Sequence, residues 1–316
     1  MGAALFCSRP AYAQQADPPA PSEPTEVKDP EPAVKAQPDP VIEPPPPADA
    51  PLTKPVELRY NGWIDGAIVL GLGVGVLSWG FAKAGFSNRT CTICDGPGTD
   101  LNGFDKAFRD AFVRQDIGPS ATLSHVFSYG VSPLMGAGLA IAVAGADKRI
   151  GEAPANIVMI LEASLVAVVF KEAFTFAIRR ERPQVHALEG QAKADEIEKQ
   201  SDPLESFPSG HVLSIMAITS SSATIATMRG YRLAPLIWVA GSTLAATVTY
   251  LRVAADQHYM SDNLIGAAIG TGVGFLVPYL FHRPVKPGDK AGLLSGAMIG
   301  TNEVAGGRVV NVGFAW

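Results

Sequence analysis

Charged side chains are scarce in this sequence. Asp, Glu, Lys and Arg make up 17% of its 316 residues, whereas hydrophobic residues make up 47%. In ordinary soluble domains about a quarter of the residues are charged, so this lower share indicates a membrane protein. The sequence also lacks a block of basic residues, and its formal net charge is −5. A nucleic-acid partner is therefore not expected.

Cysteine is also rare, with Cys7, Cys91 and Cys94 as its three occurrences. Cys7 falls in a leader-like segment, which leaves the pair in the stretch "CTIC". Outside the cytoplasm this pair would form a tight disulfide. Inside, it would stay a reduced dithiol or supply half of a metal site. A second pair of ligands is missing, so neither a metal nor another cofactor is expected.

The N-terminal 57 residues show no pattern of a folded core. Residues 1–13 resemble a secretory leader, because an Ala-Tyr-Ala stretch precedes Gln14, although the first residues carry no positive charge and the apolar stretch is short. The alternative is a chance match. Residues 14–57 are dense in Pro and Ala and are predicted to form a disordered tether.

Long apolar runs begin after Trp63 and predict the fold class. They cover roughly 64–86, 126–146, 154–178, 211–228, 233–251 and 263–281. Each is near the ~20 residues that a helix needs to cross a bilayer. A large soluble all-α protein is the alternative. We predict an all-α transmembrane bundle of five or six spans over residues 58–285, followed by a tail over 286–316 with a short β-hairpin that turns near Gly306–Gly307.

Basic residues between the runs predict the orientation of the bundle. The basic residues that would face the cytoplasm are Lys148, Arg149, Arg229, Arg232, Arg283, Lys286 and Lys290. Six spans would then leave the N-terminal side of the run 64–86 in the cytoplasm, whereas a cleaved leader would leave it outside. Either the leader is not a signal or this run does not span. Its six glycines weaken it as a helix, so five spans are more secure than six.

Three polar clusters are expected at the extracytoplasmic ends of the spans. One contains His211 within "FPSGHV", the second contains Arg180 and Arg182 within "IRRERPQ", and the third contains Arg252 within "LRVAADQHYMSDN". In the third cluster His258 and Asp262 are four residues apart and share a helix face. An aspartate there would accept a hydrogen bond from one ring nitrogen and leave the other free as a nucleophile. Guanidinium groups, a helix N-terminus and two histidines together predict a site for phosphoryl transfer.

These residues resemble the type 2 phosphatidic acid phosphatases, which share a fold with the vanadium haloperoxidases and bacterial class A acid phosphatases. The family has three ordered motifs, Lys-x6-Arg-Pro, Pro-Ser-Gly-His and Ser-Arg-x5-His-x3-Asp. The second is complete here at residues 208–211, and the third matches from Arg252 onward, with Leu251 in place of the leading serine. The first retains Arg182-Pro183, but Thr175 stands at the lysine position, and Lys171 lies one helical turn earlier.

The resemblance implies a role for each matched residue. His258 attacks phosphorus, Asp262 orients His258, and His211 protonates the leaving oxygen and then activates water. The phosphoryl oxygens are held by Arg182, Ser209, Gly210 and Arg252, with Lys171 or Arg180 as further contacts. It implies metal-independent hydrolysis of a phosphate monoester or diphosphate, with a lipid as substrate and the site on the extracytoplasmic side of a bacterial-type inner membrane. A soluble periplasmic protein is the weaker alternative.

Two other functions remain open at this point. A vanadate-dependent haloperoxidase would use the same pocket, although the membrane-like runs argue against it. An inactive lipid-binding scaffold would explain Thr175 at the lysine position. Glu162 lies within an apolar run, and the sequence identifies no partner for it. The histidines that match no motif are His125, His186 and His282. We interpret these four as structural or solvated.

Overall fold

The computed structural model describes residues 56–86, 91–92, 101–199 and 202–285, and the backbone of residues 297–304 and 307–314. The leader predicted over 1–13 and almost all of the tether predicted over 14–57 lie outside these residues. Cys7 and Cys94 lie outside them as well, whereas Cys91 is described and is disulfide-bonded.

Long helices form the described part of the chain, and six segments are long and apolar enough to cross a membrane. Two of these segments contain more than one helical element: α3 (Gly118–His125), the π-helical turn η1 (Val126–Val131) and α4 (Ser132–Ala146) form one, and η2 (Ile150–Glu152) and α5 (Ala153–Ile178) form another. The other four are α1 (Gly62–Phe86), α8 (Gly210–Met228), α9 (Ala234–Ala254) and α10 (Met260–Phe281). This confirms the predicted all-α transmembrane bundle and makes the chain an integral membrane protein.

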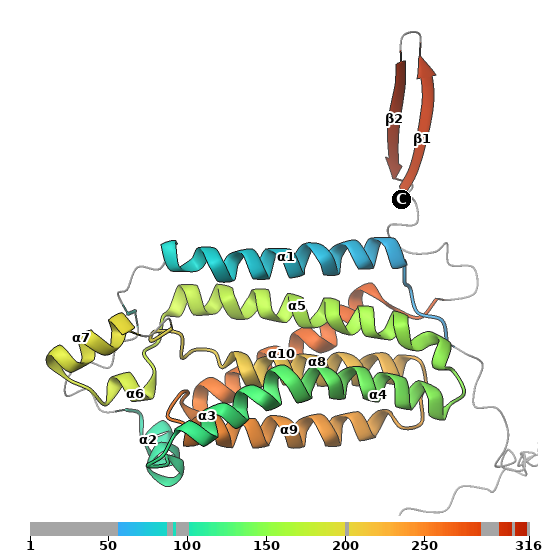
Figure 1. The fold of residues 1–316 in the computed structure, drawn as a ribbon. Coiled ribbons are helices and arrows are strands. Elements are labelled where there is room, and N and C mark those ends of the chain that lie inside the picture. The colour runs from blue at the N-terminus through green and yellow to red at the C-terminus, as the bar shows by residue number, and fades with distance from the viewer. Residues whose placement is uncertain are drawn as a thin grey trace, which may run out of the picture. The chain divides into compact units, whose positions relative to one another are not determined.

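Helix α8 is the interior helix of the bundle. It packs against α4, α5, α9 and α10, whereas α1 lies at the outside and packs mainly against α5 (Figure 1). The side chains of α8 are mostly buried inside the protein, and those of α1 mostly face outward. Helix α8 therefore meets protein on all sides, which suits its many Ser, Thr and Ala residues.

The helix ends follow from simple local chemistry. Proline occupies the first turn of α4, α5 and α9, where its missing N–H would have had no partner in any case. Asn61 accepts hydrogen bonds from the backbone N–H groups of Trp63 and Ile64 and so caps α1. Helix α5 ends at Arg179, whose φ of 40° turns the chain out of the helix.

The glycine-rich run 64–86 is a complete helix, so the expected weakness of this span was wrong. Glycine costs helix stability mainly by exposing the backbone and freeing the unfolded chain, and in lipid an unfolded backbone has no water to bond. The segment before α1 pairs with the segment after α10: Leu58 bridges Pro284, and the Arg59 N–H donates to the Arg283 carbonyl over 3.0 Å. Helix α1 therefore begins at the end of the bundle where α10 finishes.

Short helices occupy the connections at the opposite end of the bundle. They are α2 (Gly103–Phe112), α6 (Pro183–His186) and α7 (Gly190–Lys199). Helix α2 packs against α9 and α10 (Figure 1). The tail contains the hairpin that we predicted: β1 (Ala297–Val304) pairs antiparallel with β2 (Gly307–Phe314), and Val304 faces Gly307 beside the turn.

Three glycines of α10 let it approach α8 closely. A Cβ on Gly266 would lie 2.6 Å from the Ser209 carbonyl oxygen, and one on Gly270 would lie 2.2 Å from the Leu213 carbonyl oxygen. Gly274 is equally close to Ala217. These contacts place the start of α8 directly against the first turns of α10, and so set the distance between His211 and His258.

We expect Gly270→Ala to lower the free energy of unfolding by about 1–3 kcal/mol, because the added methyl group must push the two backbones apart. Gly272→Ala is the matched control, since a Cβ there meets nothing within 4 Å. Thermal unfolding of both variants in detergent micelles measures the difference. Equal midpoints for the two variants would contradict this account of the α8–α10 contact.

Candidate active site

Two histidines from distant parts of the chain face each other at one end of the bundle. His211 is in the first turn of α8, and His258 is in the loop between α9 and α10. Their ring centroids are 6.3 Å apart, and both side chains are buried. Two histidines that are 47 residues apart in the chain therefore lie side by side.

The ring of His258 is held by a backbone carbonyl. Its Nδ1 lies 2.7 Å from the Ser206 carbonyl oxygen, which can only accept a hydrogen bond, so the proton is on Nδ1. Burial, reinforced by Arg252 and Arg182, keeps the pKa of His258 well below its ordinary value. The ring is therefore neutral and has an unprotonated Nε2, as a nucleophile requires.

The predicted hydrogen bond from His258 to Asp262 was wrong. One carboxylate oxygen of Asp262 accepts hydrogen bonds from the Ser206 hydroxyl over 2.5 Å and from the Tyr259 backbone N–H over 3.1 Å. The helix start explains this arrangement, because Asp262 is the N3 residue of α10 and bonds back to the residue that caps the helix. Asp262 thus positions His258 through Ser206 rather than by direct contact.

His211 has a histidine neighbour that the sequence did not identify. Its Nε2 lies 3.0 Å from Nδ1 of His125 on α3, and the ring of Tyr129 packs against both rings. One of these two nitrogens must donate and the other accept, so the rings share a proton. Because His125 is exposed, this contact connects the buried His211 to the surface of the helical bundle.

Two buried arginines flank the histidines. Arg252 donates to the Ser124 hydroxyl over 3.2 Å, and its Nε has no hydrogen-bond partner in the described structure. Arg182 donates to the Gln257 side chain over 2.7 Å and forms an ion pair with Asp202. Both guanidinium groups act electrostatically on His211 and His258. Both arginines therefore lie in the same part of the bundle as the two histidines.

The start of α8 adds neutral donors to this positive surrounding. Ser209 precedes the helix, and its hydroxyl is buried and lacks a hydrogen-bond partner within the described residues. The first backbone N–H groups of α8, beginning with that of Gly210, have no intrahelical acceptor. A bound anion would accept hydrogen bonds from this buried hydroxyl and from the helix N-terminus, and it would balance the charge of the arginines.

Arg180 does not point to the phosphate position that the resemblance implied. It donates to Asp262 over 2.6 Å and to Asp105 of α2 over 2.9 Å, and it lies over the ring of Tyr259. Burial alone would lower the pKa of Arg180, but Asp262 and Asp105 outweigh it and raise the pKa. The four hydrogen bonds that Asp105 accepts explain why its own pKa is lowered despite burial. Arg180 is a structural link between α2 and the start of α10.

Lys171 and Thr175 both lie beside the Pro-Ser-Gly-His turn. The Lys171 ammonium lies 2.9 Å from Glu172 and 3.5 Å from Glu205, while its Cε would lie 3.1 Å from a Cβ at Gly210. It is therefore next to the Pro-Ser-Gly-His turn but paired with carboxylates. Thr175 donates to the Phe207 carbonyl over 3.2 Å and fixes the same turn.

We expect Arg180→Gln to destabilise the protein by about 3–5 kcal/mol, since two buried carboxylates would lose their shared cation. Lys106→Gln is the control, because it breaks an exposed pair with Asp110 and should cost less than about 1 kcal/mol. Thermal unfolding and steady-state kinetics on a phosphorylated lipid are the measurements. A stable Arg180→Gln variant with a strongly raised KM would instead restore Arg180 as a phosphate ligand.

Comparisons with known proteins agree with these motifs. Residues 156–286 match the model of the PAP2 superfamily. A search of curated proteins found no significant match. Among solved structures, a transmembrane PAP2 type phosphatidylglycerolphosphate phosphatase from Bacillus subtilis is 20% identical, with 67% of this chain and 94% of that chain covered and a TM-score of 0.39. At this identity and TM-score the likeness carries no argument about function. The part of the chain that matches the PAP2 superfamily model, residues 156–286, contains all three motif segments.

Proposed function

We propose that the protein is a phosphatase that hydrolyses a phosphate monoester or diphosphate on a lipid, through a phosphohistidine and without a metal ion. One observation carries this proposal: His211 and His258 face each other 6.3 Å apart beside Arg182, Arg252 and the unpartnered Ser209 hydroxyl. The match of residues 156–286 to the PAP2 superfamily model supports it.

In the first step, Nε2 of His258 attacks phosphorus and the bond from phosphorus to the leaving oxygen breaks. The proton stays on Nδ1 and remains hydrogen-bonded to the Ser206 carbonyl, so the ring gains positive charge as the N–P bond forms. The negative charge of the bound substrate favours a proton on His211, which gives that proton to the leaving oxygen and becomes neutral. In the second step, neutral His211 takes a proton from water, the oxygen attacks phosphorus, and phosphate leaves with His258 restored.

Stabilisation of the transferring phosphoryl group falls to the arginines and the start of α8. Negative charge in this transition state is spread over the non-bridging oxygens, so fixed positive groups and N–H donors supply most of the catalysis. Arg252 and Arg182 provide charge, and Ser209 with the backbone N–H of Gly210 provides neutral donors. This set supplies the positive charge that a magnesium ion provides in other phosphoryl-transfer enzymes.

The location of the site supports a lipid substrate that is reached from the extracytoplasmic side. The active-site end of the bundle lies opposite the basic residues Lys148, Arg149, Arg229 and Arg232, which favour the cytoplasm. Cys91 is disulfide-bonded, and its neighbour Thr92 donates to the Arg179 carbonyl at the active-site end. A disulfide favours an oxidising compartment. The histidines also lie at helix ends, level with where a lipid head group would lie.

We expect His258→Ala to lower turnover by more than about a thousandfold and to prevent formation of a labelled phosphoenzyme. His211→Ala should slow hydrolysis but still form the phosphoenzyme with a substrate whose leaving group needs no proton. Phosphate release and acid-quenched labelling, both with EDTA present, measure the two steps. His186→Ala is the control for loss of a histidine outside the site.

Each possible outcome of that experiment separates the functions. Vanadate-sensitive phosphate release in EDTA supports the phosphatase. Vanadate-dependent oxidation of bromide by peroxide, without phosphate release, would identify a haloperoxidase. A folded wild-type protein that releases no phosphate from any of several phosphorylated lipids would leave the scaffold as the better interpretation, with Thr175 at the lysine position as its cause.

Asp202 is paired with the guanidinium of Arg182, to which the proposed substrate would bind. Its carboxylate pairs with Arg182, its backbone carbonyl accepts from the same guanidinium over 2.9 Å, and its side chain is 42% exposed. An exposed carboxylate on a buried phosphate-binding arginine is a weak internal competitor for the phosphoryl group. Binding of substrate would displace the side chain toward water.

We expect Asp202→Asn to lower KM for a phosphorylated lipid by about 2- to 5-fold and to change kcat by less than about twofold, because the competing charge is lost. Asp195→Asn in the same connection removes an equal charge that bonds to Gln191 instead. Steady-state kinetics of the two variants at constant ionic strength make the comparison. An unchanged or raised KM would show that Asp202 positions Arg182 for the substrate.

A further inference from the structure

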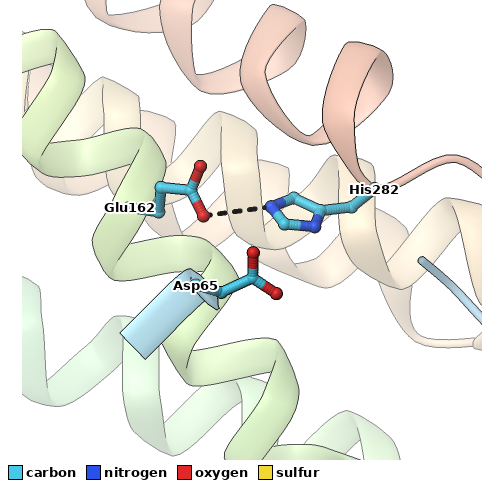
Figure 2. A group of neighbouring side chains, drawn as sticks. All are labelled: Asp65, Glu162 and His282. Carbon is cyan, nitrogen blue, oxygen red and sulfur yellow. Dashed lines mark hydrogen bonds and ion pairs between the residues drawn. The ribbon is translucent and has the colours of Figure 1, made fainter. Parts of the chain in front are cut away.

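Three buried ionisable side chains meet at the end of the bundle remote from the phosphate site. They are Asp65 on α1, Glu162 on α5 and His282 directly after α10 (Figure 2). One ligand atom from each lies within 4.8 Å of the others, and the residues are 8%, 6% and 2% exposed. Glu162 and His282 were interpreted from the sequence as structural or solvated, and because the three residues lie in different segments, their spacing did not indicate that they meet.

The histidine of this cluster has the orientation of a metal ligand. Its Nδ1 lies 2.9 Å from the Arg59 carbonyl oxygen, which fixes the proton on that nitrogen and directs Nε2 toward the two carboxylates. Histidines that bind metals generally donate their second ring nitrogen to a carbonyl or carboxylate in this way. Asp65 is also held from behind, since it accepts from the Asn61 backbone N–H over 2.7 Å. The pattern is that of a supported ligand set.

The distance between two of the ligand atoms suits a small tetrahedral ion, and the third lies within 4.8 Å of both. Two ligand atoms bound to one tetrahedral zinc at 2.0–2.1 Å lie about 3.3 Å apart. Nε2 of His282 and a carboxylate oxygen of Glu162 are 3.2 Å apart. Figure 2 shows the Asp65 carboxylate directed toward the space beside both groups. A fourth position would remain for water.

Charge favours the same conclusion. Two carboxylates with one neutral imidazole carry two negative charges, and even a protonated imidazole leaves one of them uncompensated within the cluster. Buried charge of one sign is costly unless an opposite charge completes it. A divalent cation neutralises both carboxylates at once. One nitrogen and two oxygen ligands suit zinc and, more weakly, manganese.

We infer that Asp65, Glu162 and His282 bind one divalent transition-metal ion of the zinc class. The ion joins α1 to α5 and to the end of α10, and so fastens the outermost helix at the end where the segment before α1 pairs with the segment after α10. Its role is structural and does not depend on the proposed phosphatase function.

The test uses the full chain, free of any affinity tag, stripped with EDTA in detergent micelles and then supplied with zinc chloride alone. We expect about one bound zinc per chain after desalting, measured by elemental analysis, and a higher thermal midpoint. Glu162→Gln and Asp65→Asn should each weaken zinc binding by more than about tenfold. His211→Gln is the control, because it removes a histidine from the other cluster and should leave this binding intact.

Three results would overturn the inference. Wild-type protein that retains no zinc at low micromolar concentration would show that the cluster is an ion pair of His282 with Glu162. Zinc that binds equally to Glu162→Gln and Asp65→Asn would lie elsewhere, and zinc lost in His211→Gln would belong to the catalytic histidines. Should one carboxylate variant fail to fold, the other variant and the wild-type stoichiometry still decide.

Discussion

The buried carboxylate of Asp262 is the contact on which the arrangement of the active site depends. It bonds to the Ser206 hydroxyl, to the Tyr259 N–H and to Arg180. Those three bonds join the loop before α8, the start of α10 and the end of α5. The Ser206 carbonyl in turn fixes the His258 ring. A buried carboxylate is stable only with such a full set of donors, so the same bonds that make Asp262 tolerable also set the geometry of the nucleophile.

Much of this site could be predicted from the sequence, because its chemistry lies in short motifs at helix ends. Pro-Ser-Gly-His before one apolar run, and Arg252, His258 and Asp262 between two others, indicated which residues would meet. The partner of each residue could not be predicted in the same way. The Ser206 carbonyl is a backbone atom, and every residue has one. No spacing rule reveals which carbonyl a histidine will contact, so the direct bond to Asp262 was the wrong expectation.

Long-range pairs explain the other differences. Arg180 was assigned to phosphate because it is next to Arg182 in the motif, yet two residues apart beyond a helix end can point in opposite directions. Its partner Asp105 lies on α2, outside any motif, and reaches it only through packing of α2 on α10. His125 shows the same limit, since it matches no motif and becomes significant only because α3 carries it to His211. The motifs therefore indicated which residue types lie in the site, but not which residues contact one another.

The two polar clusters of the bundle carry surplus charge of opposite sign, and this sign determines what can complete each of them. At one end Arg252 lies beside a histidine that burial keeps neutral, while Arg182 is paired with the half-exposed Asp202, so displacement of Asp202 leaves a positive surplus. At the other end Asp65 and Glu162 share one imidazole, so the surplus is negative. Neither surplus is stable in a low-dielectric interior without a counter-charge. Because the clusters lie at opposite ends of the bundle, neither can neutralise the other, and we propose that a phosphoryl group completes the first and a divalent cation the second.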